Sequence, residues 1–331
     1  MKILYVANYY EDVGAISGQV ALLQQHIQQE QVAQATIFST VGSPLKRIGL
    51  FFRLFFVAKS YDMIHAHGCS FWGFLPIVYG FLVAKMRKKR IITTFHGGDA
   101  QTFFQRTKWA TKMLKHCDTN IVQSAFLQKI FNQYGIPTSV IPNIMEVLPE
   151  PIAPQKIEPN FLSVRKLDAQ YSVFTILQIF QAIATDYPQA TLTILGDGKQ
   201  RKMLENWAKK HQINAHFVGK VPNSAIYDYH KQCSFLLNTS LVDNMPISLM
   251  EAMNSGLVVI SGDTGGIPCL IENEKNGLLG DANDVKSMLQ KTLWALQNPQ
   301  KCEQIRQNAR QTIQKYQWSE VKNAFLAIYR L

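Results

Sequence analysis

The chain has 331 residues, 47% of them hydrophobic and 17% charged, which excludes a disordered or coiled-coil protein and suggests two globular domains. Its five cysteines lie far apart without a Cys-x-x-Cys pair, which excludes a zinc ribbon and indicates a reducing compartment. The formal net charge is +11, and the first 150 residues hold 15 Lys and Arg against 8 Asp and Glu. This excess favours anionic partners, although solubility alone could explain it.

Short apolar runs alternate with helix-length segments through the first half of the chain. The predicted helices include Gln19–Gln29 and Thr107–His116. Strand, helix and strand at this spacing predict a parallel sheet with helices on both faces. The predicted strands are Lys2–Ala7, Ala35–Ser39, Met63–Ala66, Arg90–Phe95 and Thr119–Gln123.

Two apolar segments raise the question of membrane targeting. The run Met1–Ala7 is too short for a signal peptide before the acidic pair Glu11-Asp12. The segment Met63–Ala84 contains no Asp, Glu, Lys or Arg and is long enough to span a bilayer. Its first third is polar, so we expect a buried strand, loop and helix there instead.

Five prolines between residues 142 and 159 exclude a helix or a central strand, so we predict a linker at 148–159. The alternating pattern then restarts, and an amphipathic helix is predicted near the end, with Val321, Phe325 and Ile328 on one face. The predicted strands are Asn160–Val164, Thr191–Leu195, Ala215–Val218, Phe235–Asn238 and Leu257–Ile260, and the predicted helices are Tyr171–Tyr187, Lys199–His211 and Ile247–Ser255.

These patterns predict an α/β protein with two doubly wound, Rossmann-like domains facing across a cleft. The first domain is expected at 1–147 and the second at 160–314, with a final helix at 315–331 that packs back on the first. In such sheets, ligands bind outside the carboxyl ends of the strands.

Two stretches of the first domain follow predicted strands. In Asn8–Gly18, Gly14 lets the backbone approach a ligand and the next helix offers its N-terminus to a phosphate, although a simple turn explains the glycine equally well. In Thr94–Asp99, His96 is expected to face the cleft, and a turn histidine bonded to Asp99 is the alternative. His65 and His67, on the neighbouring strand, are expected to be core or rim residues. Two histidines at this spacing could also bind a metal, but no third ligand is evident.

Two stretches of the second domain carry charge. Ser163–Ser172 includes Arg165 and Lys166, two adjacent cations that follow a predicted strand. In Asp243–Gly256, Pro246 begins a helix, and the expected unpaired amides are those of Ile247–Leu249. Glu251 lies one turn inside, where it either binds sugar hydroxyls or simply stabilises the helix.

These four stretches, in this order, resemble the retaining glycosyltransferases of the GT-B fold, in particular glycosyltransferase family 4 (glycosyl transferases group 1). His96 and Asp99 match the family's His-Gly-x-Asp, and Lys166 takes the place of Arg in Val-Gly-Arg-Leu. Asp243 and Glu251 take the acidic places of Glu-x7-Glu. The departures are Ala15 for a second glycine, Tyr171-Ser172 for Lys-Gly, Ile144 for Gly, and Asp243 for Glu.

The resemblance implies a function for each matching residue. The family's Arg and Lys hold the donor diphosphate, a leaving group that gains negative charge. Arg165 or the hydroxyl of Tyr171 is expected to replace the missing lysine at that diphosphate. The implied catalytic residues are His96, Asp243 and Glu251, with His96 and Asp99 on the acceptor side; the implied donor-binding residues are Gly14, Arg165, Lys166, Gly196, Val218, Ile247, Ser248, Leu249 and Glu251.

The implied activity is the transfer of a hexose-type sugar, with retention, from a nucleotide diphosphate sugar to a saccharide or lipid-linked saccharide in cell-surface polysaccharide or lipopolysaccharide synthesis. The alternatives are a non-catalytic binding subunit of a polysaccharide assembly complex and a sugar-nucleotide epimerase of the same fold. No cofactor and no essential metal are expected, because neither Asp-x-Asp nor a metal triad occurs.

Residues 45–59 interleave aromatic and aliphatic side chains with Lys and Arg, and residues 85–90 add five cations. This pattern suits either an interfacial helix on anionic lipid or a buried helix with cations at its exposed edge. We therefore expect a cytoplasmic protein that can lie peripherally on the inner face of a membrane. Nucleic acid is not an expected partner, because no recognised motif accompanies the charge.

Overall fold

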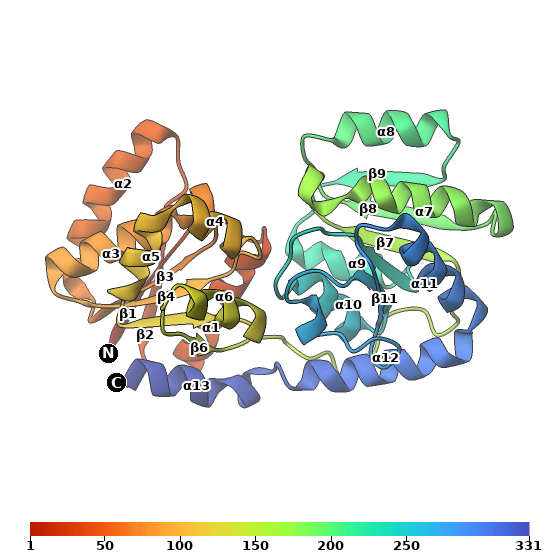
Figure 1. Ribbon diagram of the computed structural model, residues 1–331. Coiled ribbons are helices and arrows are strands. Elements are labelled where there is room, and N and C mark those ends of the chain that lie inside the picture. Colours follow the sequence, from red (N-terminus) through yellow and green to blue (C-terminus); the bar gives the residue numbers. More distant parts are fainter. Residues whose placement is uncertain (331) are drawn as a thin grey trace. The chain divides into compact units, whose positions relative to one another are not determined.

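The computed structural model describes residues 1–330 and, except at residue 44, their side chains. Leu331, the last residue of the predicted final helix, lies outside the described residues. The chain forms two compact units, whose elements are labelled in Figure 1. The first unit consists of Met1–Ile144 and the helix α13 (Trp318–Arg330), and the second consists of Met145–Gln317.

The first unit is built on a parallel sheet with the strand order β2-β1-β3-β4-β5-β6. The order reverses between β1 and β3, so the carboxyl ends of these two strands form the switch point at which doubly wound sheets bind ligands. The strands are β1 (Lys2–Ala7), β2 (Gln34–Ser39), β3 (Met63–Gly68), β4 (Arg90–Phe95), β5 (Thr119–Val122) and β6 (Ser139–Val140).

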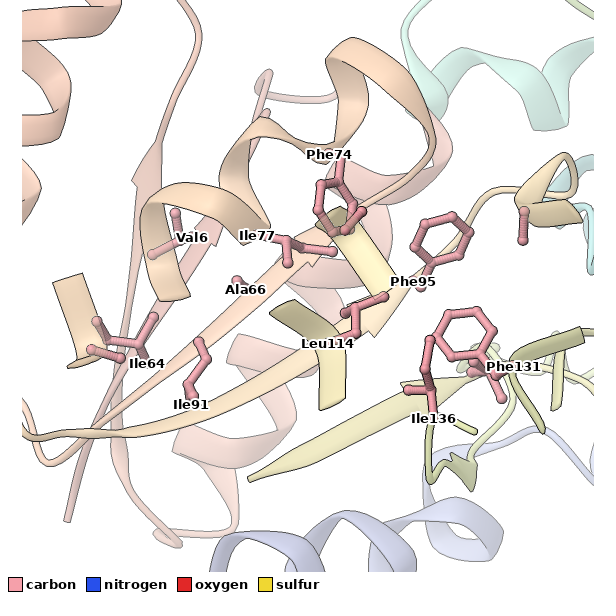
Figure 2. Packing of buried hydrophobic residues seen from close by; sticks show 14 of the residues in the cluster. Val6, Ile64, Ala66, Phe74, Ile77, Ile91, Phe95, Leu114, Phe131 and Ile136 are labelled. Atoms are coloured by element: carbon pink, nitrogen blue, oxygen red, sulfur yellow. The ribbon is translucent and has the colours of Figure 1, made fainter. Parts of the chain in front are cut away.

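Helices cover both faces of this sheet. One face packs against α2 to α6 and the short 3-10 turns η1 (Ala58–Ser60) and η2 (Phe71–Phe74). In this core the ring of Phe95, on β4, contacts that of Phe131, with centroids 5.4 Å apart (Figure 2). The other face packs against α1 and α13 through side chains such as Val20 and Phe325. The helices are α1 (Ala15–Gln29), α2 (Pro44–Val57), α3 (Leu75–Arg87), α4 (Ala100–Arg106), α5 (Lys108–Lys115) and α6 (Ala125–Gln133).

The second unit is built on a parallel sheet with the order β12-β11-β10-β7-β8-β9, which reverses between β7 and β10. Its strands are β7 (Asn160–Val164), β8 (Thr191–Leu195), β9 (Ala215–Gly219), β10 (Phe235–Asn238), β11 (Val258–Gly262) and β12 (Leu278–Gly280). Its helices are α7 (Val173–Asp186), α8 (Arg201–Lys210), α9 (Ile226–His230), α10 (Ile247–Ser255), α11 (Val285–Gln297) and α12 (Pro299–Gln314).

The two doubly wound units confirm the predicted fold class, and ten of the strands were predicted to within a few residues. The strands β6 and β12, of two and three residues, were not predicted. Edge strands this short have too few residues to show a hydrophobic alternation. Met63–Ala84 forms β3, η2 and most of α3, as expected. Among residues 1–330, every helix is too short or too polar to cross a bilayer.

Candidate functional site

An ion pair marks the switch point of the second unit. Arg165 follows β7 and Asp243 lies in the loop after β10, and the guanidinium Nη2 is 2.7 Å from the carboxylate Oδ2. The two side chains are 13% and 15% exposed. Arg165 Nε also donates to Asn238 Oδ1 over 2.8 Å, at the end of β10. A charged pair thus stands where ligands bind in this kind of sheet.

Buried hydrogen bonds hold this pair in place. Asn238 donates from Nδ2 to Ser261 Oγ (2.8 Å), and Ser240 Oγ donates to Asn238 Oδ1 (2.7 Å). The Tyr171 ring lies 5.9 Å from the guanidinium carbon of Arg165. Two of the three guanidinium nitrogens of Arg165, Nε and Nη2, are therefore held by polar partners. The third, Nη1, has no hydrogen-bond partner within the described chain.

Lys166 is held by a different carboxylate. Its ammonium lies 2.6 Å from Asp168 Oδ2, and the other oxygen of Asp168 accepts a bond from the Lys199 amide over 3.1 Å. The bond to Asp168 raises the pKa of Lys166, and the same bond lowers the pKa of Asp168. The two cations that the sequence places side by side are thus drawn to separate acidic partners.

Two glycines after β8 allow the neighbouring loops to approach closely. Gly196 has φ +132°, and a Cβ there would lie 1.9 Å from the carbonyl oxygen of Arg165. A Cβ at Gly198 would lie 2.4 Å from the carbonyl oxygen of Leu167, whose amide donates to Asp197 O over 3.0 Å. This packing function was missed from the sequence, although a Gly-x-Gly after a strand is a signal for close backbone approach.

A β-bulge displaces Val218 from the sheet. Ile194 pairs with Phe217 and Leu195 with Gly219, so Val218 is skipped in the ladder between β8 and β9. The carbonyl of Phe217 accepts from Arg201 Nη2 over 3.1 Å, and that of Gly219 accepts from the Gly196 amide over 2.7 Å. Bulges of this kind re-aim backbone groups next to binding sites.

The N-terminus of α10 corrects one expectation. The Leu249 amide donates to the Pro246 carbonyl over 3.1 Å, because the first turn of the helix is tight. Of the three predicted amides, those of Ile247 and Ser248 have no partner among residues 1–330, so the predicted set is reduced to two. The buried Ser248 Oγ also has no partner in this part of the chain.

Glu251 lies on α10 and is half-buried. Burial raises the pKa of its carboxyl to about 8. Burial also raises the pKa of Tyr227 on α9, and the negative charge of Glu251 adds to that effect. Tyr227 was not predicted, because nothing in its local sequence indicates contact with a helix that begins twenty residues later.

The histidines of the first unit come together at the carboxyl ends of β3 and β4. His67 Nδ1 lies 3.2 Å from His96 Nε2, and the rings of His65 and His67 have centroids 4.2 Å apart. Burial lowers the pKa of His96 to about 4, so the cluster is neutral near pH 7. The ring partner of His96 through Nε2 is thus His67.

Asp99 lies at the start of α4, where its carbonyl accepts from the Phe103 amide over 3.0 Å. Gly14, with φ +85°, directly precedes α1, and in the described structure no atom lies within 4 Å of a Cβ placed there. Within residues 1–330, no group of three or more His, Cys, Asp or Glu side chains is arranged to hold a metal ion.

Family models match both parts of the chain. The model described as "Glycosyl transferases group 1" matches residues 146–312, and the model described as "Glycosyltransferase Family 4" matches residues 22–147. The chain belongs to the glycosyl transferases group 1 family. The sequence resemblance to glycosyltransferase family 4 and to the GT-B fold is therefore confirmed.

Relatives of this family align with the chain at low identity. An uncharacterized glycosyltransferase of Haemophilus influenzae is 26% identical over 43% of this chain, and the alignment spans only 40% of that relative's length. An uncharacterized 41.2 kDa protein in the cps region of Klebsiella pneumoniae is 24% identical over 98% of this chain and 95% of its own. A solved Anabaena structure, HepE in complex with UDP and glucose, covers 100% of both chains with 17% identity and a TM-score of 0.81, which shows the shared fold.

Proposed function

We propose that the protein is a retaining hexosyltransferase that takes its sugar from a nucleotide diphosphate sugar. The observation that carries this proposal is the set of donors at the β7/β10 switch point. Arg165 Nη1 and the amides of Ile247 and Ser248 have no hydrogen-bond partner among residues 1–330. A diphosphate leaving group gains negative charge as the bond to the sugar breaks, and oriented donors stabilise that charge. Membership of the family supports the same reaction class.

The remaining residues of the second unit suit the rest of the donor. Glu251 accepts hydrogen bonds from the ribose diol, and the displaced backbone of Val218 meets the base. Lys166 lies on the loop after β7 and contacts the diphosphate when it leaves Asp168. Asp243 holds Arg165 and lies near the transferred sugar. The UDP and glucose held by the Anabaena protein support a uridine nucleotide as the first donor to test.

The first unit takes the acceptor in this proposal. His96, neutral and half-buried, offers its Nδ1 to a sugar hydroxyl, and Asp99 lies three residues further along the same loop. A saccharide or lipid-linked saccharide is the acceptor class, with a place in cell-surface polysaccharide or lipopolysaccharide synthesis. The position of the Klebsiella relative in a cps region supports this assignment.

We further propose that the first unit contacts an anionic membrane, so that the protein is cytoplasmic and peripheral. One face of α2 carries a row of exposed apolar side chains: Leu45 (83% exposed), Ile48 (60%), Phe52 (58%) and Phe56 (70%). The opposite face buries Leu54 completely in the core. The helix therefore presents apolar surface to solvent in addition to the face that it buries, which is typical of an interfacial helix.

Cations surround this apolar row. Lys46, Arg53 and Lys59 are exposed on or next to α2, and the sequence has no Asp or Glu between residues 31 and 61. The end of α3 joins the same surface, because Arg87 Nε donates to Phe55 O over 3.0 Å and its guanidinium lies 3.7 Å from the Phe55 ring centroid. Residues 45–59 and 85–90 thus form one surface, complementary to anionic lipid.

The decisive experiment is thermal unfolding with a panel of nucleoside diphosphates and nucleotide sugars. A ligand that binds only the folded state raises the unfolding midpoint. We expect a selective rise with one nucleotide that is lost in Glu251→Ala and kept in the matched control Glu150→Gln, whose side chain is exposed. If no nucleotide raises the midpoint of the folded protein, the donor site assigned here is wrong.

The alternatives give different outcomes in a turnover assay with the nucleotide sugar that binds. Transfer to an added saccharide acceptor supports the transferase. Isomerisation of the sugar without an acceptor supports the epimerase of the same fold. Binding without turnover across saccharide and lipid-linked acceptors supports the binding subunit, for which the partial neutralisation of Arg165 by Asp243 is the favouring observation.

A further inference from the structure

A buried chain of hydrogen bonds links the last turn of the chain's final helix to the histidines of the first unit. Tyr329, on α13, has its hydroxyl 2.8 Å from His65 Nδ1 and 3.1 Å from the hydroxyl of Tyr5. The other nitrogen of His65 lies 2.7 Å from Thr94 Oγ1. These four side chains are at most 4% exposed, so water does not compete for the bonds.

His65 is therefore fixed at both ring nitrogens, and its orientation is set. In a neutral imidazole one ring nitrogen donates a hydrogen bond and the other accepts one. Whichever tautomer His65 adopts, Tyr329 bonds to one nitrogen and Thr94 bonds to the other. Without the Tyr329 hydroxyl, Nδ1 would be a buried polar atom without a partner.

His67 depends on His65 for its own orientation. Its Nε2 has no hydrogen-bond partner among the residues that the structure describes, so its one bond is the 3.2 Å contact with His96. Packing supplies the rest, with the His65 ring centroid at 4.2 Å and that of Tyr5 at 5.7 Å. The ring of His96 is in turn held by His67, with centroids 5.5 Å apart and planes 22° from parallel.

We propose that Tyr329 is a positioning residue for His96. It fixes His65, which supports the ring of His67, which orients His96 through the bond between Nδ1 and Nε2. The helix that ends the described chain thus contributes to the acceptor-side site of the first unit, although 233 residues separate Tyr329 from His96. The consequence for catalysis rests on the function proposed for His96, whereas the orientation itself does not.

The test compares Tyr329→Phe with Phe325→Leu. The first removes one hydroxyl and keeps the ring, and the second weakens the packing of the same helix without touching a histidine hydrogen bond. The ring ¹⁵N signals of His65, His67 and His96, assigned by single substitutions, report tautomer and hydrogen bonding. We expect Tyr329→Phe to shift the signals of all three histidines and Phe325→Leu to leave those of His96 unchanged. Unchanged His96 signals in Tyr329→Phe overturn the proposal.

Activity provides the second readout. We expect Tyr329→Phe to lower kcat about 10-fold while the KM for the nucleotide sugar stays the same, because small displacements of a site residue slow the reaction step. An equal loss in Phe325→Leu would mean that α13 acts only through stability. If no transfer is found with any acceptor, the proposed function fails while the ¹⁵N comparison still decides whether Tyr329 positions His96.

Discussion

Asp243 neutralises Arg165 at the switch point of the second sheet, with 2.7 Å between carboxylate and guanidinium. Asp243, which takes the first acidic place of Glu-x7-Glu, therefore forms an ion pair with a cation of the protein itself. Arg165 is the residue that the sequence offered as a substitute for the missing family lysine. The pair means that the guanidinium of Arg165 is held in one orientation and that its positive charge is partly balanced.

Breaking this pair from either side should destabilise the protein. Asp243→Asn leaves the Arg165 charge largely buried without a counter-ion, and Arg165→Gln does the same to Asp243. We expect each to cost about 1–3 kcal/mol of unfolding free energy. The double variant should cost less than the sum, with a coupling of about 0.5 kcal/mol or more. Urea unfolding of wild type, the two single variants and the double variant measures this coupling. Additive effects would show that the ion pair contributes nothing to stability.

Glu251 should make stability fall as pH rises. Its carboxyl has an unperturbed pKa of 4.5, which burial raises to about 8 in the folded protein. Between these values the folded state holds the proton more tightly, so stability is lost from about pH 5 to pH 8. We expect Glu251→Gln to remove this loss and to unfold at a higher temperature than wild type at pH 8. The gain in free energy of unfolding should be about 1 kcal/mol or more at pH 8 and smaller at pH 5.

Calorimetry across this pH range measures the effect. Glu150→Gln is the matched control, since Glu150 is exposed. The same difference between Glu251→Gln and wild type at both pH values would contradict the raised pKa of Glu251.

The α2 surface should bind anionic vesicles. We expect wild type to sediment with phosphatidylglycerol vesicles and not with phosphatidylcholine vesicles, and salt should weaken the binding because surface charge is screened. Phe52→Ser with Phe56→Ser removes exposed apolar area without touching the core, so binding should fall about 10-fold or more. Met203→Ser, an exposed apolar residue on α8, is the control that should bind normally. Equal binding by all three proteins would contradict the assigned surface.

Gly196 should tolerate no side chain. A Cβ there would lie 1.9 Å from the carbonyl oxygen of Arg165, and its φ of +132° is itself unfavourable for other residues. We expect Gly196→Ala to cost more than about 3 kcal/mol and to displace the loop that carries Arg165. Gly49→Ala is the control. Its added methyl meets no described atom within 4 Å, so we expect a gain of about 0.5–1 kcal/mol in the middle of α2. Thermal unfolding compares the two, and equal midpoints would refute the close approach.

Much of the fold was predictable because it rests on local pattern. Buried parallel strands read as short apolar runs, and the prolines between 142 and 159 mark a stretch without a helix or a central strand. The ordered motifs were enough to suggest the family. The tightened first turn of α10 was not predictable, because Pro246 as a helix start does not tell whether the Leu249 amide bonds back to it.

Local sequence pattern is sufficient to predict the alternation of strands and helices, the charged residues and the chain positions at which strands end. Which of those residues meet depends on how the chain folds. Arg165 pairs with Asp243 because β7 and β10 are neighbours in the sheet, and His65 meets Tyr329 across 264 residues because the final helix packs on the first unit. Such pairs depend on the order of strands in the sheet and on the packing of the final helix against the first unit. Local hydrophobic periodicity carries no information about either.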